Sequence, residues 1–188
     1  MSSVFGRRAL VAFALLLLAA ATAPRAATLE ILDVETSESN RMLVAAAELD
    51  VAFSEGMVDA LKSGVRLTID IDLEVVKPVR YWLDDVVTHV RHSYAIELHA
   101  LSARFVVTDT ARAQQWTFPS LEDVVGFLKK PPAMPFAEAD IIGGEQGYAG
   151  RLRARLDIES LPAPLRPVAY LSPSWWMASD WVEWPIEP

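Results

Sequence analysis

The sequence predicts an all-β fold with minor α content: an antiparallel β-sandwich of about seven strands, two short connecting helices and a C-terminal tail rich in proline and tryptophan. Two observations predict it. Apolar residues occupy every second position in several segments, a period that places them on one face of a strand. No strand alternates with a long helix, as a doubly wound α/β fold requires. A strongly curved half-barrel is the alternative architecture.

The first 27 residues have the parts of a secretory signal. Two arginines precede an apolar run over residues 9–23, and small residues follow as far as Ala27. A bilayer core of about 30 Å needs roughly 20 apolar residues, so this run is short for a permanent membrane helix. We therefore expect residues 1–27 to be a signal peptide cleaved within 23–27, and the protein to be periplasmic or otherwise exported. An inner-membrane anchor formed by residues 9–23 is the alternative.

Residues 28–188 are expected to form a single β-rich domain. Its clearest strand runs from Val65 to Val76, where Leu67, Ile69 and Ile71 alternate with polar residues. Such alternation is typical of a sheet with one buried face. The predicted strands, sequentially adjacent and antiparallel, are residues 28–36, 42–53, 65–76, 86–98, 103–108, 115–118 and 148–159.

Two short helices are expected at connections. Ser54 can cap the first, and Gly64 can end it in a left-handed conformation. Ser120, followed three residues later by Asp123, resembles a capping box and opens the second, over residues 121–128. Three prolines then forbid further helix, so we expect a loop from residue 131 to about Gly147.

Composition excludes several kinds of chemistry. The chain has no cysteine, and therefore no disulfide, thiolate metal site or thiol nucleophile. It carries 17 Lys and Arg against 25 Asp and Glu, a net charge of −8, and residues 1–27 hold three of the arginines and no acid. Because nucleic acids and anionic lipids are bound mainly through Lys and Arg, nucleic acid is excluded as a partner. A membrane is a partner only if the N-terminal segment stays uncleaved. No cofactor is expected.

The three histidines do not have metal-site spacing. His89 and His92 would face opposite sides of one strand, and His99 lies far from His89. No HExxH, GxSxG or SxxK motif occurs. We therefore expect neither a metal site nor a catalytic residue. The alternative is a hydrolase with a scattered site around His89 and His92, with Asp84 or Asp85 as the carboxylate.

Two rows of charge share one spacing. Asp70, Asp72 and Glu74 alternate along the strand 65–76, and we expect them to lie on a solvated face, because calcium loops need a glycine-containing turn that is absent here. The strand 148–159 carries arginines at the same two-residue period. If the two strands pair, opposite charges face each other, so we predict that they are adjacent in one sheet and that Asp72 lies near an arginine. The arginines are Arg151, Arg153 and Arg155.

The C-terminal tail combines six prolines with four tryptophans over residues 161–188. Proline removes a backbone donor, so the tail should be extended and should cross the fold rather than enter the middle of a sheet. One interpretation is that Trp175, Trp184 and Ile186 close one end of the core. The other is that the tail offers a surface for a ligand or partner, formed by Trp175, Trp176, Trp181 and Trp184.

Four motifs resemble those of an uncharacterised family of exported proteobacterial proteins, the domain of unknown function 4390. They are Gly64-Val65-x-Leu67, Arg80-x-Trp82, Leu161-Pro-x-Pro-Leu-Arg-Pro167, and the Trp176, Ser179, Trp181, Trp184 tail. The resemblance covers nearly all of the chain after residue 27. It transfers no activity and no catalytic residue. Genes of the family often lie near one for a membrane sensor kinase of the nitrogen-regulation type, which implies an envelope partner of that kind.

Export, a one-sided β fold, an aromatic tail and the lack of a catalytic motif favour a non-enzymatic envelope module. Its expected role is to bind a protein, a peptide or a glycan, as an accessory protein linked to a membrane sensor kinase. The hydrolase around His89 and His92 remains the second hypothesis. Convergence of a histidine, a carboxylate and a nucleophile in a cleft would distinguish the two.

Overall fold

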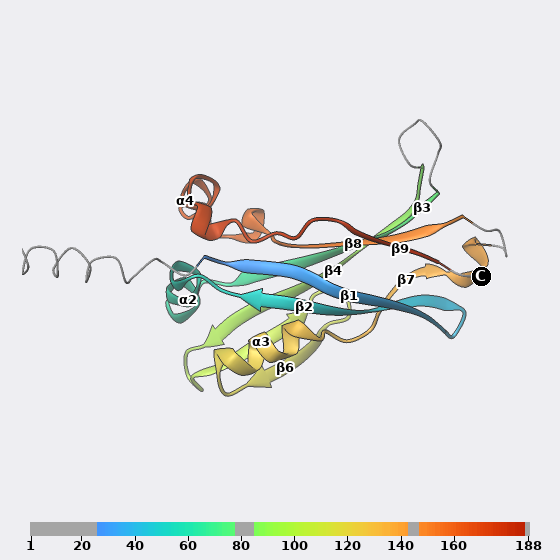
Figure 1. Cartoon of the computed structure of the whole chain (residues 1–188). Coiled ribbons are helices and arrows are strands. Elements are labelled where there is room, and N and C mark those ends of the chain that lie inside the picture. Colours follow the sequence, from blue (N-terminus) through green and yellow to red (C-terminus); the bar gives the residue numbers. More distant parts are fainter. Residues whose placement is uncertain (1–25, 78–84, 143–146, 187–188) are drawn as a thin grey trace, which may run out of the picture.

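The computed structural model describes residues 26–77, 85–142 and 147–186, and these form an antiparallel β-sandwich (Figure 1). One sheet has three strands in the order β1-β2-β7, and the other has six in the order β6-β5-β4-β3-β8-β9. The strands of the described residues divide into two separate sheets, so the sandwich is confirmed over the half-barrel. The strands are β1 (Thr28–Ser39), β2 (Met42–Ala52), β3 (Leu67–Lys77), β4 (Asp85–His99), β5 (Arg104–Asp109), β6 (Gln114–Phe118), β7 (Met134–Glu138), β8 (Ala149–Leu156) and β9 (Val182–Pro185).

The seven predicted strands are confirmed, and the described residues contain two more. The expectation of a loop over residues 131–147 is wrong, because β7 lies within it and pairs with the first part of β2. Its Pro135 is tolerated at the edge of the three-stranded sheet, where one side of the strand needs no donor. Strand β9, from the proline-rich tail, is likewise an edge strand on β8.

Both predicted helices form as expected. Ser54 Oγ accepts a hydrogen bond from the Met57 amide at the start of α2 (Glu55–Lys62), and Gly64 follows it with a φ of +83°. Ser120 Oγ accepts from the Asp123 amide at the start of α3 (Leu121–Lys129). The tail is not wholly extended, since it contains a third helix, α4 (Arg166–Leu171), with a proline in its first turn.

The core lies between the two sheets and beneath α3. The odd-numbered residues of β2 and β3 point inward, among them the buried Leu49, Ile69 and Leu73. The even-numbered residues of β4 share this face, because Tyr94 lies opposite Ile69 in the ladder. Phe127 of α3 packs on Tyr94, Trp116 and Phe118, which covers the part of the large sheet that the small sheet does not reach.

The predicted signal peptide lies outside the described residues apart from Ala26 and Ala27. Among the helices of the described ranges, none has the length and hydropathy to cross a membrane.

Candidate functional site

The outer face of the six-stranded sheet carries a charge ladder across three adjacent strands. The predicted pairing of β3 with β8 is confirmed: Asp70 lies opposite Arg155, Asp72 opposite Arg153, and Glu74 opposite Arg151. On the other side of β3, strand β4 places Ser93, Arg91 and His89 against the same three acids. We call these nine side chains the charge ladder.

Asp72 is the centre of the charge ladder. Its carboxylate accepts from Arg91 Nε at 2.7 Å, and it lies 3.2 Å from His89 Nε2 and 3.4 Å from an Arg153 nitrogen. Burial alone would raise the pKa of Asp72, but the hydrogen bond and charge of Arg91, with contributions from His89 and Arg155, hold that pKa below its ordinary value. Asp72 is therefore a buried anion with several cationic partners.

Asp70 has fewer cationic partners than Asp72, although it lies on the same face two residues away. Its carboxylate accepts from Ser93 Oγ at 2.7 Å, and Arg91 Nε lies 3.5 Å away. Burial raises the pKa of Asp70, and these two partners offset the rise only in part.

The expectation that this acidic face is solvated is wrong. Asp70 and Asp72 are buried, since long side chains of the neighbouring strands β4 and β8, among them Arg91 and Arg153, close over this face. The Trp181 ring lies over the guanidinium groups of Arg151 and Arg153, at 4.9 and 4.6 Å from its centroid. Arginines occupy the positions that a cation would need, so the charge ladder stabilises the sheet by mutual compensation and does not form a calcium site.

The four tail tryptophans do not form one surface. Trp175 is buried, and Trp184 packs over Gly150 on the inner face, where its Nε1 donates to Thr36 Oγ1 at 2.7 Å. Together with the position of Trp181 over the arginines, this favours the structural interpretation for three of the four. Trp176 alone is mostly exposed, with 60% of its surface accessible, and it lines a pocket of about 550 Å³ beside Tyr170 and Arg155.

The histidines do not converge on one site. His89 lies on the outer face against Asp72, whereas His92 points into the core and its Nε2 donates to the Pro135 carbonyl at 3.0 Å. Asp85 is exposed at the start of β4, and Asp84 lies outside the described residues. Within the residues that the structure describes, no group of three or more His, Asp or Glu has the geometry to hold a metal ion.

A small polar cluster lies in the core beside His92. The Tyr94 hydroxyl and His92 Nδ1 are buried and have no hydrogen-bond partner among the described residues. Burial raises the pKa of Tyr94 to about 12 and lowers the pKa of His92. The buried Asp109 accepts from the amides of Ala111 and Arg112, so it is satisfied by its own turn. The cluster is a cost to stability rather than an open site.

Sequence reasoning missed an open edge on the small sheet. Strand β1 pairs with β2 along its whole length, but β7 pairs with β2 only over Met42–Ala45. From Ala46 to Ala52, the β2 edge that faces away from β1 therefore has no strand partner in the described part of the chain. Helix α3 flanks this edge, and its Lys129 bridges to Asp50 at 2.9 Å. An unpaired edge presents backbone donors and acceptors for another strand.

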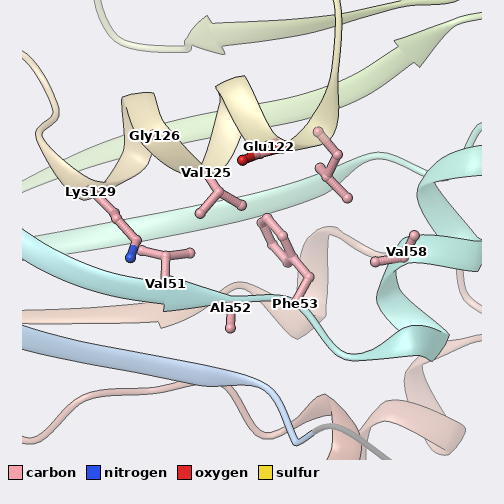
Figure 2. Close-up of a pocket in the computed structure, with 9 residues that line it drawn as sticks. Val51, Ala52, Phe53, Val58, Glu122, Val125, Gly126 and Lys129 are labelled. Carbon is pink, nitrogen blue, oxygen red and sulfur yellow. The ribbon is translucent and has the colours of Figure 1, made fainter.

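The last residues of this edge border an apolar groove (Figure 2). The groove has a volume of about 530 Å³. Its two charged lining residues, Glu122 and Lys129, lie about two helical turns apart on α3. Its remaining lining residues are apolar or small: Val51, Ala52, Phe53, Val58, Leu121, Val125 and Gly126.

Gly126 leaves space at the wall of this groove. It lies within α3, where glycine costs about 0.5–1 kcal/mol relative to alanine. A Cβ at this position would meet no atom within 4 Å, so packing does not require glycine here. Its effect is to keep the wall of the groove open. A lone glycine in a helical pattern was the available signal in the sequence, but it indicates nothing until β2 and α3 are placed beside each other.

Comparison of the sequence with models of known protein families identifies the family to which the chain belongs. The model of a domain of unknown function, DUF4390, matches residues 26–185. The matched residues run from the start of the sandwich to the end of β9 and include the charge ladder and the groove. No curated protein and no solved structure matches the chain significantly. The family resemblance of the sequence is therefore confirmed, and the chain belongs to the DUF4390 family.

Proposed function

We propose that the protein is an exported, non-enzymatic binding module that holds an extended peptide segment of an envelope partner in the groove between β2 and α3. The observation that carries the proposal is the unpaired edge of β2 beside an apolar groove. In strand addition, backbone hydrogen bonds supply affinity, and pockets for alternate side chains supply specificity. Here the unpaired edge of β2 offers the backbone hydrogen bonds, and the groove beside it offers the pocket for side chains.

The lining of the groove favours a peptide over a glycan. Val51, Phe53 and Val125 provide an apolar wall, and Phe53 is too buried to offer a stacking face to a sugar ring. The exposed aromatic ring that would suit a glycan belongs to Trp176, which lines a different pocket. A peptide with apolar side chains at alternate positions fits an edge whose inward residues also alternate.

Export and the partner are supported by the sequence. The order of basic, apolar and small residues over 1–27 is that of a secretory signal. The partner that the family resemblance implies is a membrane sensor kinase, whose part outside the cytoplasm would supply the peptide segment.

Selection from a library of random displayed peptides on the purified protein tests this function. We expect enriched peptides to carry apolar residues at every second position. They should lose binding to Gly126→Phe, because a ring at this position fills the groove. Gly126→Ala is the matched control, since a methyl group has free space there and should leave both folding and binding intact.

A second control separates the two pockets of the molecule. Trp176→Ala removes the exposed ring without touching the groove, so the enriched peptides should bind it as they bind the wild type. Peptides that bind Gly126→Phe fully, or that need Trp176, would place the binding surface elsewhere.

A further inference from the structure

A second exposed surface lies on the tail, separate from the groove. Helix α4 and the turn after it expose four large side chains, which we call the tail patch: Val168 (52% exposed), Tyr170 (50%), Leu171 (83%) and Trp176 (60%). Val168 and Leu171 are three residues apart and therefore lie on one face of the helix. Exposed apolar side chains of this size that gather on one segment mark a site of contact with a membrane or another molecule.

The charge around the tail patch is unusual for this chain. The protein carries 25 acidic residues, yet residues 161–179 contain none. The one cation of this stretch, Arg166, donates to the Leu161 carbonyl and lies 3.4 Å from Glu159. The four side chains of the patch are therefore uncharged, and two of them are aromatic, while charged residues of both signs lie at its border: the Tyr170 hydroxyl donates to Glu159, and Arg91 and Arg155 line the pocket that Tyr170 and Trp176 share. Apolar and aromatic side chains bordered by charges of both signs fit the headgroup boundary of a zwitterionic bilayer, which has no net charge and where Trp and Tyr are enriched.

The tail patch lies at the end of the sandwich where the described chain begins. Thr28 pairs with Ala52, three residues before the start of α2, and the Trp175 indole lies 3.6 Å from the position of a Cβ on Gly56 in α2. Figure 1 shows α4, α2 and the first residues of β1 at this same end. Residues 1–25, which include the apolar run 9–23, join the molecule here. In the alternative in which this segment stays uncleaved as an anchor, insertion of that run into a bilayer would bring this end of the domain to the lipid.

We propose that the tail patch rests in the interface of a neutral phospholipid bilayer and orients the domain on the membrane next to its N-terminal segment. Tyr170 and Trp176 lie at the headgroup level, with their polar atoms already satisfied: the Tyr170 hydroxyl donates to Glu159, and Trp176 Nε1 donates to the Tyr170 carbonyl at 3.1 Å. Leu171 and Val168 reach the boundary of the acyl chains, about 5–10 Å below the headgroup surface. The groove of Figure 2 is lined by other residues than the tail patch.

The absence of cysteine allows a direct test with the full chain. Leu171→Cys, at an exposed position, accepts a single polarity-sensitive fluorophore. The labelled protein is bound to phosphatidylcholine vesicles that contain either ordinary or brominated acyl chains. We expect a blue shift of the label on vesicle binding and loss of its emission with brominated chains, because bromine quenches only at contact.

Ile141→Cys is the matched control. Ile141 is also exposed, but it follows β7 at the opposite end of β2, where the Ala139 amide donates to the Arg41 carbonyl. Its label should keep its emission in brominated vesicles. Equal quenching at both positions, or none at position 171 while the chain is bound, would overturn the proposal. Energy transfer between labelled copies at position 171 without quenching by lipid would overturn it as well, in favour of a second copy of the chain.

Discussion

Asp70 and Asp72 show how strongly neighbours decide the state of a carboxylate. The two side chains lie two residues apart on one strand, on one face, and both are buried. The pKa of Asp70 is raised by burial, whereas that of Asp72 is lowered by its cationic partners. The difference follows from the partners: a hydroxyl and a more distant arginine for Asp70, and three arginines with the ring of His89 for Asp72.

The same isosteric change should therefore have unequal effects at these two positions. Asp72→Asn leaves three partly exposed arginines without their shared anion, and we expect it to lower the free energy of unfolding by about 1.5–3 kcal/mol. Asp70→Asn keeps an acceptor for the Ser93 hydroxyl, and we expect a loss of about 1 kcal/mol or less. Urea denaturation of both variants at pH 7 measures this. A larger loss for Asp70→Asn would show that Asp72 is not the centre of the charge ladder.

The pH dependence of stability should report His92. Its pKa is lowered in the folded protein, so the unfolded chain binds the proton first as the pH falls through about 6.5. Unfolding is then favoured, and stability should decrease from pH 7 to pH 5. His92→Gln can still donate to the Pro135 carbonyl but does not titrate, so its stability should change less over this range. An unchanged pH dependence in His92→Gln would contradict a buried, neutral His92.

At the scale of the elements, periodicity predicted strands well and their environments poorly. The alternation in β2 and β3 identifies the inward residues, because one face of each strand meets the core. The outer face of β3 has the same pattern whether water or the side chains of adjacent strands surround its acids, and so the burial of these acids could not be predicted. Only the match in spacing between the acids of β3 and the arginines of β8 carried information on pairing, and that prediction is confirmed.

Strands β7 and β9 were missed for a related reason. Each is short, each contains a proline, and each lies at the edge of a sheet, where a proline costs no ladder hydrogen bond. Their pairing depends on partners that are distant in sequence. The groove could not be predicted either, because it exists only where β7 stops short along β2.

The packing of β9 on β8 depends on one glycine. A Cβ on Gly150 would lie 2.5 Å from Cζ2 of Trp184, closer than any real contact allows. We expect Gly150→Ala to lower stability by about 1–3 kcal/mol, through overpacking. In a Trp184→Ala background the same change should cost almost nothing, since the ring is gone, and a double-mutant cycle from thermal unfolding measures this coupling. Additive effects would show that Trp184 does not lie over Gly150.

At the scale of the whole molecule, two unequal sheets leave one edge uncovered. The six-stranded sheet is stabilised on its outer face by the charge ladder and on its inner face by the small sheet and α3. The three-stranded sheet lacks a full-length third strand, so most of one β2 edge meets α3 and the groove instead of another strand (Figure 2). Natural proteins usually protect such edges, and an edge left open beside an apolar groove is suited to a partner strand.

Hydrogen exchange of the β2 backbone amides, with and without a selected peptide, tests the strand-addition function most directly. The peptide should slow the exchange of amides within Ala46–Ala52 that point away from β1, because they gain a strand partner. Amides around Trp176 should exchange as before. Unchanged exchange along β2 with a bound peptide, or protection confined to the surface around Trp176, would contradict strand addition at this edge.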